Sequence, residues 1–158
     1  MEEQTAIGDR ETAGELHDRL SEMSAEVAVK ALEVVDGGRF VPQVGEATYA
    51  GKIDRERGRV DWVHPAASID RQVRAMSPWP GGWVPWAGGP LKLLSVRPVD
   101  DKGAPGTILA VSPELIIACG EGALVLEQVR APGRKAVSGR DFANGAHLEK
   151  DASLQPSE

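Results

Sequence analysis

The sequence has little that would support a disulfide, a metal centre or a membrane span. Its 158 residues include one cysteine, so no internal disulfide can form, and a lone thiol is typical of a reducing compartment. No apolar run approaches the ~18 residues that a membrane-spanning helix needs. The three histidines are scattered without metal-ligand spacing, and the acidic start is unlike a secretory signal. We therefore expect a cytoplasmic protein with no metal site and no membrane partner.

Aromatic residues are also scarce, at 4% of the chain, yet all four tryptophans lie between residues 60 and 86. A buried tryptophan removes ~150–250 Å² of surface from water, so the stretch is expected to anchor the core. We predict that Trp62 and Trp79 are buried there, with less weight on Trp83 and Trp86. The alternative is a platform on which nucleic-acid bases stack.

The middle of this stretch is predicted to be a helix. Pro65 suits its first position, and Pro78 disfavours helical backbone at the residue before it. Between the two prolines, apolar residues recur at three- and four-residue spacing, which gives the helix one apolar face. These residues are Ala66, Ile69, Val73 and Met76.

The second half of the chain reads as short strands separated by turns. Strands are expected near Trp83 and at residues 91–96, 107–111, 115–119 and 123–126. A last helix is expected to begin after Ser138 and to run through Ala143. Five closely spaced short strands favour a small β-barrel, so the predicted class is mainly β with helices (α+β).

Residues 10–38 are predicted to form two helices ahead of the strands. Thr12 and Glu15 have the spacing of a capping box, and Ser24 can cap a second helix. We therefore divide the chain into a helical segment (1–38), a linker (39–47), a barrel domain (48–143) and a disordered tail (144–158).

The net charge of −6 is unevenly distributed along the chain. Residues 1–49 hold 4 Lys/Arg against 11 Asp/Glu, residues 50–140 hold 13 against 9, and residues 141–158 hold 1 against 4. The middle of the chain is therefore basic between acidic flanks, which is compatible with an RNA partner. The candidate phosphate contacts are Lys52, Arg71, Arg74, Lys92, Arg134 and Lys135. A solvated basic face without a ligand is the alternative.

Several short sequence blocks of this chain resemble the C-terminal domain of methionyl-tRNA formyltransferases. They are Val60-Asp61-Trp62, the Arg74-Ala75 pair on the helix and Pro78-Trp79-Pro80-Gly81, with further blocks at 48–53, 104–108 and 133–137. The resemblance implies an oligonucleotide-binding-like barrel that binds tRNA, with Lys52 in a segment that runs along the tRNA. It also implies that residues 1–38 are the last helices of the family's catalytic domain.

The resemblance implies a reaction whose machinery this sequence lacks. The family transfers a formyl group from 10-formyltetrahydrofolate to the amine of initiator methionyl-tRNA, using an N-terminal domain with Ser-Leu-Leu-Pro and Asn-x-His motifs. Neither motif occurs here, so we assign no catalytic residue and no cofactor to this chain. The first hypothesis is a truncated or split formyltransferase that is inactive alone. Its expected partners are initiator tRNA, bound weakly, and a separate catalytic half.

Two other hypotheses stay open at this point. The chain is alternatively a stand-alone RNA- or protein-binding module without an enzymatic role. A third possibility is a barrel from another formyltransferase, one that acts on sugar nucleotides or is linked to folate oxidation. The segment around Lys52 and the Pro-Trp-Pro-Gly form favour the tRNA enzyme over that third possibility.

Overall fold

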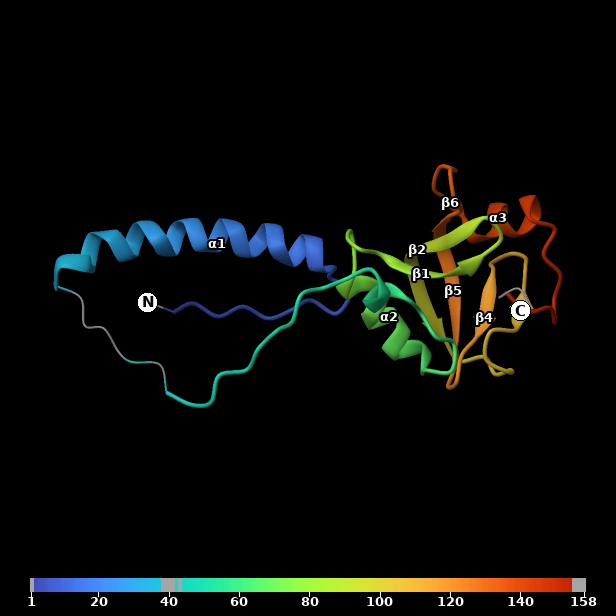
Figure 1. The fold of residues 1–158 in the computed structure, drawn as a ribbon, viewed down its shortest axis with the longest axis horizontal. Helices are drawn as coiled ribbons and strands as arrows, with labels where there is room; N and C mark the ends of the chain where they lie inside the picture. Colours follow the sequence, from blue (N-terminus) through green and yellow to red (C-terminus); the bar gives the residue numbers. More distant parts are fainter. Residues whose placement is uncertain (1, 38–41, 43, 155–158) are drawn as a thin grey trace.

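In the part of the chain that the structure describes, the fold combines one six-stranded antiparallel sheet with three α-helices (Figure 1). The computed structural model describes residues 2–37, 42 and 44–154, and within them no helix is long and apolar enough to cross a membrane. The α+β class and a helical segment ahead of the sheet are confirmed. The elements in chain order are α1 (Ala13–Val34), η1 (Val35–Gly37), η2 (Glu56–Gly58), α2 (Ala66–Ala75), β1 (Gly82–Trp86), β2 (Gly89–Val99), β3 (Ile108–Ala110), β4 (Ile116–Ala118), β5 (Ala123–Arg130), β6 (Val137–Ser138) and α3 (Gly139–Gly145).

The sheet does not close into the expected barrel. Its strands follow the order β1-β2-β5-β4-β3, with edges at β1 and β3, and the two-residue β6 is paired to β5 off this path. Short segments cover these edges instead of joining them. Val60 donates its N–H to the carbonyl of Trp83 at 2.8 Å on the β1 edge, and Ile108 donates to the carbonyl of Ala152 at 2.9 Å on the β3 edge. Both edges are thus partly paired without closure.

Helix α2 covers the core face of the sheet, as its apolar spacing predicts. Ile69 and Val73 are 1% and 2% exposed, and Trp62, just ahead of the helix, is 2% exposed. Gly82, at the start of β1, lies in close contact with Val73. A Cβ added at Gly82 would lie 2.9 Å from a Val73 methyl carbon. The burial predicted for Trp62 and for the helix face is confirmed.

Trp79 is not in the core, contrary to the prediction. Its side chain is 67% exposed, while the neighbouring Pro80 is buried. Two hydrogen bonds hold the loop: Gly81 N–H donates to the carbonyl of Met76 at 2.8 Å, and Lys92 Nζ donates to the carbonyl of Pro80 at 3.1 Å. These bonds fold the loop back onto α2, with Pro80 inward and Trp79 toward solvent.

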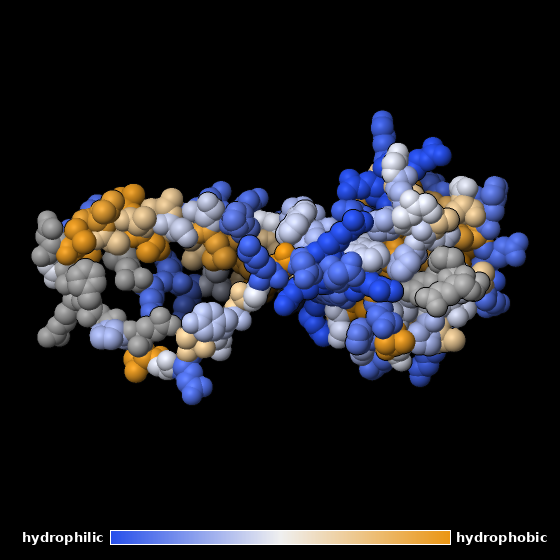
Figure 2. All heavy atoms as spheres, in the orientation of Figure 1, coloured by the Kyte–Doolittle hydropathy of each residue, from blue (hydrophilic) through white to orange (hydrophobic). Residues whose placement is uncertain are grey.

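The N-terminal segment forms one continuous helix, α1, where two were expected. Ser24 does not cap a second helix; its hydroxyl donates to the carbonyl of Leu20 at 2.7 Å, which a continuous helix accommodates. The capping box of Thr12 and Glu15 is confirmed at the start of α1. The helix then runs away from the sheet, and none of its residues is buried (Figure 1). Figure 2 shows apolar side chains on its distal part, where Leu32 is 73% exposed.

Residues 148–154, within the segment predicted as a tail, pack along the sheet domain. Leu154 is fully buried, and its N–H donates to the carbonyl of Gly106 at 3.0 Å. This segment lies along β3, so its backbone hydrogen bonds and one apolar side chain hold it in place. Residues 155–158 of the predicted tail, and 39–41 and 43 of the predicted linker, lie outside the described residues. The domain boundaries themselves stay predictions.

Candidate nucleic-acid interface

The outer face of the sheet, opposite α2, presents basic side chains at alternating positions. Lys92 lies between Leu91 and Leu93, which are both buried, and exposed Arg130 follows the buried Val129. Because side chains alternate between the two faces of a strand, Lys92 and Arg130 point away from the core. The same alternation places Trp83, flanked by buried Gly82 and Val84, on the outer face.

Strand register brings these side chains into one row. Trp83 is opposite Lys92, and Lys92 is opposite Arg130. Arg59 is paired with Trp83 in an isolated parallel bridge at the edge of the sheet. Side chains opposite one another across neighbouring strands lie on the same face and within contact range. We name these four residues, Arg59, Trp83, Lys92 and Arg130, the cationic row.

Trp83 holds the incoming segment against the sheet. The guanidinium carbons of Arg55 and Arg59 lie 5.8 and 5.9 Å from its ring centroid, within range of a cation–π interaction. Its Nε1–H donates to the carbonyl of Arg55 at 2.9 Å. Strongly hydrophilic side chains gather where residues 50–59 cross the sheet domain (Figure 2). Trp83 therefore adds two arginines of this segment to the basic face.

Arg74, a predicted phosphate contact, is engaged inside the protein. Its Nε donates to Asp70 Oδ2 at 3.0 Å, and its Nη1 donates to the carbonyl of Glu11 at 3.0 Å. Arg10 completes the cluster from the opposite side, with Nη1 on Asp70 Oδ1 at 2.8 Å and Nη2 on the carbonyl of Val96 at 2.7 Å. The cluster ties the chain ahead of α1 to α2 and β2, and this geometry favours a structural role for Arg74.

The other predicted contacts lie at separate places on the surface. Lys52 and Arg71 are exposed, and Arg71 donates to Ser68 Oγ at 3.1 Å on its own helix. Arg134 and Lys135 are exposed in the loop between β5 and β6. The structure thus brings one predicted residue, Lys92, into the cationic row and distributes the rest around it.

Sequence reasoning missed three basic residues of this face: Arg55, Arg59 and Arg130. For Arg130, the available signal was its position after a buried valine in a strand that alternates toward its end. Arg55 and Arg59 had no such local signal, because a bridge to β1 and the Trp83 ring place them on the face. Predicting which residues belong to the cationic row therefore requires the register between segments that are distant in the sequence.

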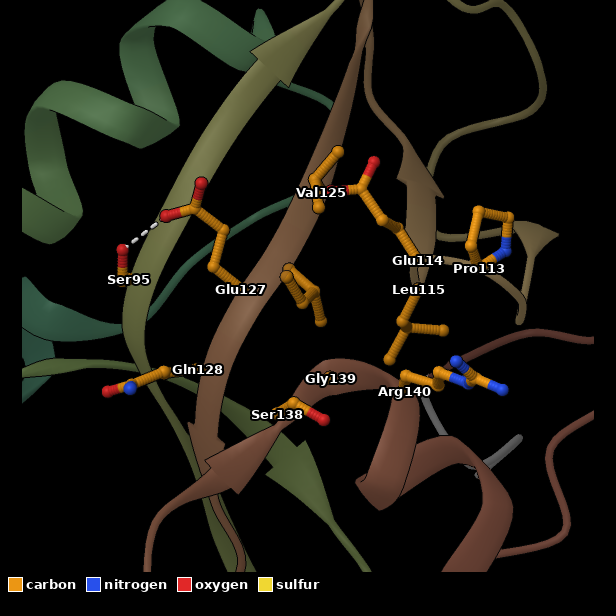
Figure 3. A pocket seen from close by; sticks show the side chains of 11 residues that line it. Ser95, Pro113, Glu114, Leu115, Val125, Glu127, Gln128, Ser138, Gly139 and Arg140 are labelled. Atoms are coloured by element: carbon orange, nitrogen blue, oxygen red, sulfur yellow. Dashed lines mark hydrogen bonds between the residues drawn. The ribbon is translucent and has the colours of Figure 1, made fainter.

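A hollow farther along the outer face has the opposite character (Figure 3). Ser95 donates its hydroxyl proton to Glu127 Oε2 at 2.5 Å, as the dashed line shows. Arg97 donates to Glu114 at 2.7 Å and pairs with Glu127 at 3.3 Å, and the first of these bonds raises the pKa of its guanidinium above the ordinary value. Glu114, Glu127 and Arg140 line the hollow, and Arg97 pairs with both carboxylates, so these four side chains give the hollow no excess positive charge for a phosphate.

The described residues offer little for covalent or metal chemistry. Within residues 2–37, 42 and 44–154, no group of three His, Cys, Asp or Glu is placed to hold a metal ion. Cys119 is buried, and desolvation raises the pKa of its thiol to about 12. Since the thiolate is the reactive form, Cys119 behaves as a small apolar core residue.

Comparisons with known proteins identify the family of this chain. The profile of the formyl transferase C-terminal domain matches residues 52–147. Methionyl-tRNA formyltransferase from Parvibaculum lavamentivorans is 40% identical over 161 residues, which cover 98% of this chain and 52% of that protein. The Paraburkholderia phymatum enzyme of the same name is 46% identical over 154 residues, covering 93% and 47%.

A solved structure shares the fold. A crystal structure of HypX from Aquifex aeolicus superposes with a TM-score of 0.64 at 23% identity, covering 88% of this chain and 27% of that one. This likeness concerns the fold alone. The chain spans about half the length of the curated relatives it matches. With its profile match over most of the sheet domain, it belongs to the formyl transferase C-terminal domain family.

Proposed function

We propose that this chain is the tRNA-binding part of a methionyl-tRNA formyltransferase and acts in the cytoplasm. In this proposal the sheet domain holds the initiator methionyl-tRNA while the family's catalytic domain transfers the formyl group. The family membership and the relatives' names support the transferase context. The cationic row supports the RNA partner.

The cationic row is the observation that carries the proposal. Arg59, Lys92 and Arg130 lie on one face at neighbouring register positions, with Arg55 beside them over Trp83. Neighbouring strands are ~4.8 Å apart, so the three cations lie close enough together to contact one stretch of nucleic-acid backbone. Such contacts supply affinity and orientation without reading the sequence.

Charge reversal in the row is expected to weaken tRNA binding strongly. In the double variant Arg59→Glu and Arg130→Glu, two phosphate contacts are lost and two repulsions replace them. Both residues are exposed, and Lys92 is left intact because it also holds the loop at Pro80. We expect the affinity for initiator methionyl-tRNA to fall by at least about tenfold, and the slope of log affinity against log salt to fall by about one per lost contact. Fluorescence anisotropy at several salt concentrations measures both.

The matched control reverses two lysines away from the row, Lys102→Glu and Lys150→Glu, which are equally exposed. This control changes the net charge by the same amount, so any long-range repulsion of the RNA is common to both variants. Equal loss of binding in the two double variants, or binding by the original chain that does not depend on salt, would contradict the proposed interface.

Formyl transfer is expected only in the presence of a catalytic domain. The Ser-Leu-Leu-Pro and Asn-x-His motifs that the family uses do not occur in this sequence. Incubation of the chain with 10-formyltetrahydrofolate and methionyl-tRNA should therefore yield no formyl-methionyl-tRNA, measured by acid gel electrophoresis. Adding a separately expressed N-terminal domain of a relative should yield product if α1 docks on it. Formylation by this chain alone would refute the proposal, and failure of every added domain would favour a stand-alone RNA-binding module.

A further inference from the structure

A second cavity lies at the edge of the sheet, between the end of β1, the β5–β6 loop and α3. Its volume is about 760 Å³. Trp86 and Phe142 form an aromatic corner on its wall, with ring centroids 5.2 Å apart and an interplanar angle of 66°. Trp86 is only partly buried and packs against the core, so part of its ring remains available to a ligand. Exposed Val137 extends the apolar wall.

Both signs of charge meet at the rim of this cavity. Arg134 and Lys135 line one side, on a turn that is closed by a 3.1 Å hydrogen bond from Arg134 N–H to the carbonyl of Ala131. Asp141 lines the cavity from the first turn of α3. The ion pairs found in the described part of the chain include none of these three side chains, all of which are exposed. The side chains of Arg134, Lys135 and Asp141 are therefore available to a ligand in the cavity.

We propose that this cavity binds an unpaired guanine nucleotide of the RNA. The base packs against Trp86, its phosphate lies between Arg134 and Lys135, and its Watson–Crick edge meets the carboxylate of Asp141. Unpaired bases are recognised by stacking on aromatic rings and by hydrogen bonds to their Watson–Crick edges. Guanine is favoured because its N1–H and N2–H₂ are adjacent donors that one carboxylate accepts together. Adenine presents a single donor group beside an acceptor on that edge.

The chemistry of the cavity also decides between ligand classes. An acidic or phosphorylated peptide would satisfy the two cations, and a phosphotyrosine ring would reach Trp86. Neither carries, on a group that packs against Trp86, the two adjacent N–H donors that the Asp141 carboxylate would accept from guanine. The proposal rests on the RNA binding proposed above and adds to it a place where one base is read.

Mononucleotide binding tests the cavity separately from the cationic row. Isothermal titration of the chain with GMP is expected to give saturable one-to-one binding, and AMP and free guanosine should each bind about tenfold more weakly. Asp141→Asn should remove the preference for GMP over AMP. Arg134→Ala with Lys135→Ala should remove the preference for GMP over guanosine. These residues are exposed, and thermal unfolding confirms that each variant is folded.

The outcomes separate the two proposals. No saturable GMP binding, equal binding of GMP and AMP, or O-phosphotyrosine binding as tight as GMP would overturn the guanine site, even with tRNA binding through the row intact. Conversely, GMP binding that persists in a chain without affinity for tRNA would overturn the proposed function and leave the cavity as a nucleotide site. The Arg59→Glu and Arg130→Glu variant is expected to bind GMP normally, since neither residue lines the cavity.

Discussion

Replacing Trp62 by alanine is expected to lower the free energy of unfolding by about 3–5 kcal/mol. The ring is 2% exposed and lies against Gly106, where an added Cβ would be 3.3 Å from its Cδ1 atom. Truncation leaves a large cavity among core residues that have no space to collapse around it, so the loss combines transfer and cavity energies. Urea denaturation followed by circular dichroism measures the change.

Trp79→Ala is the matched control for this prediction, since it removes the same side chain from a site that is 67% exposed. Its expected cost is within about 0.5 kcal/mol, as for other surface substitutions. If Trp62→Ala does not fold, Trp62→Phe, which keeps an aromatic ring, provides a smaller measurable loss. Equal destabilisation by Trp79→Ala and the Trp62 variant would show that the arrangement of the tryptophans is wrong.

Reversing the charge of Arg74 is expected to cost a comparable amount, about 3–5 kcal/mol of unfolding free energy. The Asp70 side chain is 7% exposed and that of Arg74 17% exposed, so the pair is largely shielded from water. Arg74→Glu would place a second carboxylate beside Asp70 and remove the donor to the carbonyl of Glu11. Only Arg10, whose side chain is 54% exposed, would remain to compensate Asp70.

Arg71→Glu is the control, because it makes the same change three residues earlier on the same helix. Arg71 is exposed, and its side-chain hydrogen bond is with Ser68 on the surface. We expect a change in unfolding free energy within about 0.5 kcal/mol. Equal stability losses in the two variants, from urea titrations under one buffer condition, would refute the structural role of Arg74.

Helices α2 and α3 were predictable because each depends on neighbouring residues. The spacing of Ile69 and Val73 predicts α2, and Ser138 caps α3 through a hydrogen bond from Asp141 N–H at 3.0 Å. Closure of the sheet was not predictable in this way. Its edges are covered by residues 59–60 and 151–154, which come from opposite ends of the domain.

The candidate interface likewise combines residues that local sequence predicts with residues that only tertiary contacts place. Lys92 was a candidate because it is a basic residue of the central domain, and its position between two buried leucines of β2 places it on the outer face. Arg74 was assigned to RNA because its pairing with Asp70 carries no sequence signal of burial, and its other partner, Glu11, lies 63 residues away. Trp79 was assigned to the core on composition, while its exposure follows from loop bonds at Pro80 and Gly81. Tertiary contacts, not local preference, decided these two residues.

Because α1 is attached to the sheet domain near its first turn, a small change there moves the far end of the helix by a larger distance. Its N-terminus is held beside the Asp70 cluster, where Gly14 donates its N–H to the carbonyl of Ser77 at 3.0 Å and a Cβ on Gly14 would lie 2.8 Å from Pro78. The 22 residues of α1 extend about 33 Å from this pivot. A tilt of about 10° at the pivot therefore displaces the far end by about 6 Å. The methyl group added by Gly14→Ala would press against Pro78 and change the direction in which the distal end of the helix points.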